Sequence, residues 1–332
     1  MSLVIASPVA SATELGPLFQ RFLASKKADM EHGELSPRTY ADYCRAITFA
    51  TNTLGAGTPI ESLGPSDFER LYHRIASQYG IARLTRDVVM IRTAIKYLVE
   101  YCDVPPIRFG SKFKPPSLAS RRKARNAKTQ EHGERLFTSD QLRTIVGETY
   151  GQIRCMILLA INGGLNNSDL ANLPASAIQG EWLNYPRAKT GVNRRLWLWP
   201  ETREALDKIA KLRPKARLAS DHGCVFITPY GNRWVTTQLR EDGKIIISDA
   251  ISSAFRTILL ALAMRRPGLN FGALRHTYRT VADEVPDQPA ILMTMGHCDS
   301  SISNTYRERI SDERLQRISQ HVRSWLAARE ET

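Results

Sequence analysis

Residues 274–306 read LRHTYRTVADEVPDQPAILMTMGHCDSSISNTY, and this stretch carries three polar motifs in a fixed order. Leu274-Arg275-His276-Thr277 comes first, Met295-Gly296-His297 follows about twenty residues later, and Tyr306 stands nine residues after His297. Each of these motifs is weak when it stands alone. The order and the spacing of the three make them specific as a set.

A fourth motif, Ala188-Lys189-Thr190-Gly191, lies upstream of this stretch. It is flanked by residues 182–185 and 195–199, which alternate between apolar and polar side chains. Alternation on both sides of a glycine-containing turn predicts a β-hairpin. Lys189 is therefore expected near the tip of a hairpin.

Most of the remaining chain has apolar residues three and four positions apart, which predicts helices. Residues 15–101 are expected to be entirely helical, with one helix that begins at Ser36-Pro37 and ends at Gly55. Further helices are expected over residues 201–212, 248–264, 274–283, 288–295 and 312–328. The predicted fold is mainly α with a small β-sheet in the C-terminal domain, divided into a helical domain over 13–106, a basic linker over 107–134 and a mixed α+β domain over 135–332.

The charge balance favours a polyanionic partner. The 332 residues include 46 Lys and Arg against 33 Asp and Glu, a formal net charge of +13, and the pI is about 9.7. Nucleic acid is the leading candidate, ahead of an anionic membrane surface. The linker is rich in this positive charge. It is interpreted either as a solvated charge run or as a strap along a phosphate backbone. Its basic residues are Arg108, Lys112, Lys114, Arg121, Arg122, Lys123, Arg125 and Lys128.

Cysteine usage and hydropathy exclude several other classes. The five cysteines are scattered and form no C-x-x-C pair, so neither a disulfide framework nor a metal site is expected, and a reducing cytoplasm fits. Residues 1–12 lack the basic start of a signal peptide, and the apolar run 258–264 is far shorter than a membrane span. No membrane association is expected.

Taken together, the four motifs and the two-domain layout resemble the tyrosine recombinase (phage integrase) family. The resemblance implies that Tyr306 attacks a DNA phosphodiester to form a 3′-phosphotyrosyl link, while Arg275 clamps the phosphate and Lys189 protonates the leaving 5′-oxygen. His297 would hydrogen-bond a phosphate oxygen, and His276 is either structural or a helper. The resemblance also implies no cofactor, a double-stranded DNA partner, a homotetramer on DNA that is a monomer or weak oligomer when free, and a place on the nucleoid of a prokaryotic cell.

The sequence departs from the family at two positions. The family's first arginine lies in a G-L-R-x-S-E-L motif, and residues 164–170 here read GLNNSDL, so Asn166 replaces it. Gly272 stands where the family usually has histidine or lysine, three residues before Arg275. The asparagine amide can still donate a neutral hydrogen bond. The arginines that could supply the missing cation are Arg154, Arg187, Arg194 and Arg195.

Three functions follow from this pattern. The first is a site-specific DNA recombinase or integrase, and the second is an integrase-fold DNA-binding protein whose catalysis is weak or lost, acting as a regulator or accessory factor. The third is a topoisomerase-like relaxing enzyme. Tyr185 and Tyr278 are interpreted as core residues, and the helix from Asp312 onward packs either on its own domain or on a neighbouring protomer.

Overall fold

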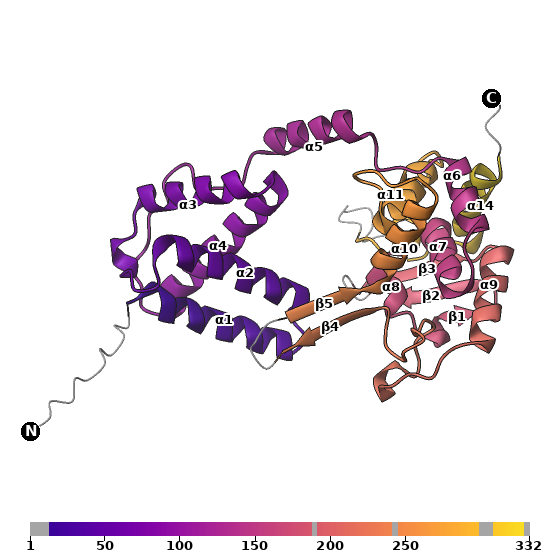
Figure 1. Ribbon diagram of the computed structural model, residues 1–332, viewed down its shortest axis with the longest axis horizontal. Helices are drawn as coiled ribbons and strands as arrows, with labels where there is room; N and C mark the ends of the chain where they lie inside the picture. Colours follow the sequence, from indigo (N-terminus) through magenta and orange to yellow (C-terminus); the bar gives the residue numbers. More distant parts are fainter. Residues whose placement is uncertain (1–12, 188–190, 241–244, 299–307, 329–332) are drawn as a thin grey trace, which may run out of the picture. The chain divides into compact units, whose positions relative to one another are not determined.

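The computed structural model describes residues 13–187, 191–240, 245–298 and 308–328 (Figure 1). The chain divides into two compact units. The first comprises Met1–Lys128 with Thr237–Ile246, and the second comprises Thr129–Thr236 with Ile247–Thr332. Each unit has a hydrophobic core of its own, which agrees with a chain long enough for two cores.

The first unit is built from the helices α1 to α4. Their bounds are α1 Leu15–Glu31, α2 Pro37–Leu54, α3 Pro65–Gln78 and α4 Ile81–Tyr101, with a short 3-10 turn η1 at Ile60–Ser62. Ser36 caps α2 by accepting a hydrogen bond of 3.1 Å from the Thr39 backbone N–H, and Gly55 ends the helix with a φ of 95°. The predicted start and end of this helix are confirmed, because both caps are set by local sequence.

The segment over residues 107–134 is more structured than an extended linker. Phe113 is fully buried in the core of the first unit, where Arg92 donates a hydrogen bond of 2.8 Å to its carbonyl oxygen. Beyond Pro116 the chain forms α5, Leu118–His132, of which no residue is buried. Ser117 accepts a hydrogen bond from the Ser120 N–H at the start of this helix, and the helix itself is rich in Ala, Arg, Lys and Gln. These residues favour helix even without a packing partner.

The second unit surrounds a small antiparallel sheet with helices. The sheet has the order β1-β2-β3, in which Leu183 of β2 pairs with Leu196 of β3. The hairpin predicted on both sides of Lys189 is therefore confirmed in its strands. The elements are α6 Ser139–Gly147, α7 Gly151–Gly163, α8 Asn167–Ala171, η2 Ala175–Ala177, β1 Ile178–Gln179, β2 Trp182–Pro186, β3 Asn193–Trp197, α9 Pro200–Lys211, η3 Ala219–Asp221, α10 Ala250–Ala261, α11 Phe271–Ala282, α12 Gln288–Met295 and α14 Asp312–Ala327.

A second sheet was not predicted. It consists of β4 Val235–Leu239 and β5 Ile245–Asp249. The helix expected from Ser248 begins instead at Ala250, because Asp249 is its N-cap and accepts a hydrogen bond of 2.9 Å from the Ser252 N–H. The apolar residues 245–247 belong to the strand that leads into this cap.

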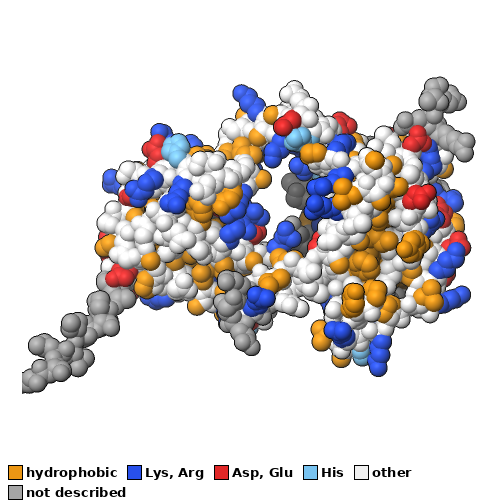
Figure 2. Space-filling model, viewed as in Figure 1, with side chains coloured by type: hydrophobic (Ala, Val, Ile, Leu, Met, Phe, Trp, Pro, Cys, Tyr) orange, Lys and Arg blue, Asp and Glu red, His pale blue; other side chains and the backbone are white. Residues whose placement is uncertain are grey.

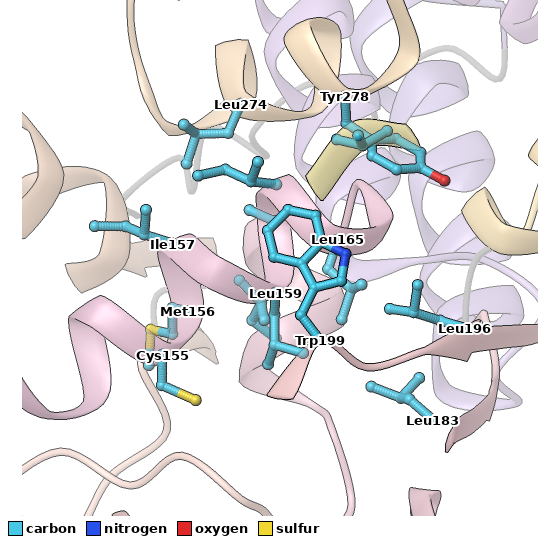
Figure 3. Close-up of a cluster of buried hydrophobic side chains, with 14 of the residues drawn as sticks. Cys155, Met156, Ile157, Leu159, Leu165, Leu183, Leu196, Trp199, Leu274 and Tyr278 are labelled. Carbon is cyan, nitrogen blue, oxygen red and sulfur yellow. The ribbon is translucent and has the colours of Figure 1, made fainter. Parts of the chain in front are cut away.

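Helix α7 lies at the centre of the second unit. Every residue from Cys155 to Gly163 is buried, as expected for a helix that is apolar all round. Figure 3 shows the side chains of Leu274 and Tyr278 on the same side of α11, one helical turn apart. Leu196 of β3 lies nearby. Because Leu274 and Tyr278 anchor one face of α11 in the core, Arg275 emerges from an adjacent face.

Helix α14 packs on its own unit. Leu315, Ile318 and Val322 are buried, and the helix contacts α11, α6 and β3. Asn162 of α7 joins these elements, since its amide donates to Ser319 Oγ at 2.7 Å and to the Trp197 carbonyl oxygen at 3.0 Å. Of the two placements expected for this helix, the structure has the one within its own unit.

Candidate active site

Arg275 links the ends of two helices. Its guanidinium donates hydrogen bonds to the carbonyl oxygen of Gly164, to the carbonyl oxygen of Met295 at 3.1 Å, and to Nε2 of His297 at 2.5 Å. Gly164 caps the C-terminus of α7, and Met295 is the last residue of α12. Since helix C-termini carry unpaired carbonyl groups and partial negative charge, both ends favour a cation here.

Two glycines allow the C-terminal ends of α7 and α12 to lie this close to Arg275 and its neighbours. Gly164 and Gly296 end their helices in the left-handed region, with φ of 65° and 63°. A Cβ atom at Gly296 would lie 3.0 Å from the Cβ of Arg187, and one at Gly164 would lie 2.8 Å from the ring of Tyr278. Glycine is thus required twice over, by the backbone conformation and by close approach.

His297 is a neutral imidazole in this arrangement. Burial, followed by the positive charge of Arg275, lowers the pKa of His297 to about 4. An arginine can only donate, so Nε2 of His297 accepts the bond and the ring proton sits on Nδ1. The Nδ1–H remains the donor of the ring in this state.

Asn166 acts as a helix cap. Its side-chain oxygen accepts a hydrogen bond of 2.9 Å from the Asp169 backbone N–H, and the Asp169 carboxylate accepts one of 3.1 Å from the Asn166 N–H. The pair forms a capping box that starts α8. Asn166 is therefore used locally, to hold Asp169 in place.

Three arginine side chains lie close to the carboxylate of Asp169. Nη2 of Arg194 lies 2.8 Å from Oδ2 of Asp169, Nε of Arg187 lies 3.7 Å from Oδ1, and Nη1 of Arg275 lies 4.0 Å from Oδ2. Arg194 also donates to the carbonyl oxygen of Met295 at 3.0 Å, so it shares this acceptor with Arg275. Burial, followed by the charges of Arg194 and Arg187, lowers the pKa of Arg275 to about 10, and the group stays a cation at neutral pH.

The other two candidate arginines lie elsewhere. Arg154 donates hydrogen bonds to the carbonyl oxygens of Val146 and Thr149, where it closes the turn between α6 and α7. Arg195 forms a bidentate pair with Asp312 at the start of α14, with both distances 2.6 Å. Arg194 and Arg195 point to opposite faces of β3 because side chains alternate along a strand.

The other predicted residues lie outside the described part of the chain, on α11, or in the interior of the second unit. Lys189 and Tyr306 fall outside the described residues. His276 is exposed on α11, and Gly272 lies near the start of that helix. Tyr278 is fully buried, which raises its pKa, and Tyr185 is half-buried and donates a hydrogen bond to the Asn172 carbonyl oxygen at 3.1 Å.

The basic segment is accessible to a partner. All eight of its Lys and Arg residues are exposed, and Lys112 forms an ion pair with Glu69. Figure 2 shows Lys and Arg side chains in blue on the visible face of each unit. Within the described part of the chain, no group of three or more His, Cys, Asp or Glu is placed to hold a metal ion. The described helices include none that is long and apolar enough to cross a membrane.

Sequence reasoning did not identify Asp169 as the partner of the site arginines. One signal was present: Arg194 occupies the same face of its strand as the buried Leu196. A charged residue in an inward register requires a buried partner of opposite charge.

Comparisons with known proteins bear on the fold. No protein-family model matches the sequence, and no curated protein matches it either. Solved structures do match. A lambda integrase tetramer bound to a Holliday junction has 15% identity and a TM-score of 0.64, and the match covers 92% of this chain and 81% of that chain.

Two further structures cover the chain to a similar extent. Tn1549 transposon integrase in complex with circular intermediate DNA has 15% identity and a TM-score of 0.58, over 93% of this chain and 99% of that chain. Lambda integrase bound to DNA has 14% identity and a TM-score of 0.60, over 89% of this chain and 95% of that chain. The chain therefore has the fold of these integrases, and the predicted fold class is confirmed.

Proposed function

We propose that this protein is a site-specific DNA recombinase of the tyrosine type. The convergence of Arg275 and His297 carries the proposal: Arg275 of α11 and His297, which follows the end of α12, are 22 positions apart and meet at 2.5 Å, in the order that the family motifs require. The fold similarity to integrases in complexes with DNA and the net charge of +13 support double-stranded DNA as the partner.

The proposed reaction needs only side chains of this chain and its neighbours on DNA. The hydroxyl oxygen of Tyr306 passes its proton to solvent and bonds to phosphorus, while the bond from phosphorus to the 5′-oxygen breaks. Lys189 donates a proton to that 5′-oxygen, and Arg275 balances the charge on the non-bridging oxygens. Rejoining reverses these steps without an external energy source.

The proposed binding mode uses both units on duplex DNA. The exposed basic segment between Arg108 and Lys128 lies along the phosphate backbone, and the protein works as a homotetramer on DNA in the cytoplasm of a prokaryotic cell. Phosphate contacts position a protein on DNA, whereas base contacts select the sequence. Salt-sensitive binding is therefore expected at any duplex.

The test is capture of a denaturant-resistant protein–DNA adduct. Nicked duplexes from DNA that flanks the gene are incubated with the protein, with Tyr306→Phe as the control and a separate binding assay. An adduct that forms with the wild type and vanishes in the variant supports the recombinase.

A second candidate is an integrase-fold DNA-binding protein without catalysis. Asn166 favours it, since this residue caps α8 and carries no charge for a phosphate. Specific binding without any adduct would favour this candidate over the recombinase. Plasmid relaxation without site preference would instead indicate the relaxing enzyme.

A further inference from the structure

The arginine cluster at Asp169 holds more positive charge than its surroundings balance. Arg187, Arg194 and Arg275 have side chains that are 11%, 0% and 14% exposed, and Asp169 is 6% exposed. No second carboxylate in the described part of the chain pairs with any of the three, and His297 is neutral. Because buried charge is costly unless it is compensated, the cluster favours an additional anion.

The cluster also has unused hydrogen-bond donors. Nε of Arg187, and Nε and Nη1 of Arg194, are buried and have no hydrogen-bond partner within the described residues. Arg194 is covered entirely, whereas Arg187 and Arg275 retain some exposure. Arg187 and Arg275 are therefore the two guanidinium groups that a ligand can reach, and Arg194 stays behind them as the structural partner of Asp169.

We propose that Arg187 supplies the guanidinium that the sequence lacks at Asn166, so that Arg187 and Arg275 together bind the non-bridging oxygens of one phosphodiester. The inference rests on the proposed function for the identity of the ligand, a DNA phosphodiester. Two guanidinium forks on one phosphate match its geometry and its charge.

The backbone fixes Arg187 at the base of the hairpin that carries Lys189. The Arg187 N–H donates to the Val192 carbonyl oxygen at 2.9 Å, and the Gly191 N–H donates to the Arg187 carbonyl oxygen at 2.8 Å. The side chain then passes over Gly296, the residue before His297. Arg187 thus enters the site from β2, beside the motif that holds His297.

Residues 166 and 187 meet the same carboxylate. Asn166 bonds to Asp169 through the capping box, and Arg187 approaches Oδ1 of Asp169 with its Nε. An arginine at position 166 and an arginine at position 187 would both bring their charge to the surroundings of Asp169. A guanidinium at position 187, at the end of β2, can therefore serve the same site as a guanidinium at position 166, at the start of α8.

The test uses Arg187→Gln, Asn166→Arg, the double variant and a matched control, Arg195→Gln. Arg195 is also an arginine of the hairpin, but its guanidinium pairs with Asp312. Adduct formation and duplex binding are measured for each protein. We expect Arg187→Gln to lower adduct formation by about a hundredfold or more with binding within about tenfold, and the double variant to recover at least about tenfold. Arg195→Gln should stay within about threefold of the wild type.

A second measurement needs no DNA site. Inorganic phosphate is titrated into each protein, and the shift in Tm is recorded. Phosphate should raise Tm in the wild type and in Arg195→Gln, and much less in Arg187→Gln. Loss of the phosphate effect in Arg187→Gln, together with specific DNA binding but no adduct in the wild type, would support the arginine site and favour the DNA-binding protein without catalysis. An adduct that Arg187→Gln does not weaken, a double variant no better than Arg187→Gln, or no phosphate effect in the wild type would overturn the inference.

Discussion

Arg275 donates a hydrogen bond of 2.5 Å to Nε2 of His297, and this bond fixes the protonation state of the imidazole. The donor is a cation at neutral and acidic pH and the acceptor must keep its lone pair, so a proton on Nε2 would break the contact and add a second positive charge. Folding therefore selects the neutral histidine, which is the reason why stability should depend on pH in a defined window.

Acidification should destabilise the protein through His297. The pKa of this residue is 6.5 in its ordinary state and about 4 in the folded chain. Between these values the unfolded state binds a proton that the folded state does not, so the free energy of unfolding falls as pH falls from 6.5 toward 4. Urea denaturation of the wild type and of His297→Gln across this range tests the expectation. The variant should lose stability less steeply, and parallel profiles would contradict it.

Replacing Arg275 should separate catalysis from binding. Arg275→Ala is expected to reduce adduct formation by about a hundredfold or more, because the transition state loses a charged clamp, while duplex binding through many other phosphate contacts changes less. The carbonyl groups of Gly164 and Met295 also lose a donor, so the variant should unfold about 1–3 kcal/mol more easily. Adduct capture, anisotropy and urea denaturation measure the three effects. Equal losses of binding and cleavage would show that Arg275 is not the clamp.

Asn162 should matter for stability far from the phosphate chemistry. It is fully buried, donates to Trp197 and Ser319, and accepts a hydrogen bond of 3.0 Å from the Trp199 backbone N–H. Asn162→Ala leaves that N–H without a partner and opens a cavity, at a cost of about 2–4 kcal/mol. Asn52→Ala, at an exposed position of α2, should change stability by less than about 0.5 kcal/mol. If Asn162→Ala and Asn52→Ala changed the urea midpoint to a similar extent, the role of Asn162 in stability would be refuted.

Gly163 should tolerate no side chain. A Cβ atom there would come against the side chain of the fully buried Leu196, within 3.0 Å of its Cδ1. Gly163→Ala is therefore expected to cost about 1–3 kcal/mol by overpacking. Gly147→Ala is the control, because a Cβ at the end of α6 meets nothing within 4 Å, and alanine favours helix. Thermal denaturation compares the two, and a neutral Gly163→Ala would show that the strand can shift.

Local sequence was sufficient for most of the helices and for the strands on both sides of Lys189. Ser36 and Gly55 marked the ends of α2, since capping depends on residues a few positions apart. The β4–β5 sheet was missed because each strand is only five residues long and because β5 ends at Asp249, directly before the first residue of α10. Helix α5 was missed because the charge run and Pro115-Pro116 favoured a linker, whereas helix propensity decided the structure of Leu118–His132.

The sequence by itself determined which chemical groups this protein has: the motif with Arg275, the motif with His297, and an asparagine at position 166. Tertiary structure decided which of the other arginines joins them. Arg194 and Arg195 are neighbours in the chain, yet one is buried against Asp169 and the other pairs with Asp312. Ion pairing acts over a few ångströms in space, and only the tertiary structure brings Arg194 within that range of Asp169 in α8 and Arg195 within that range of Asp312 in α14.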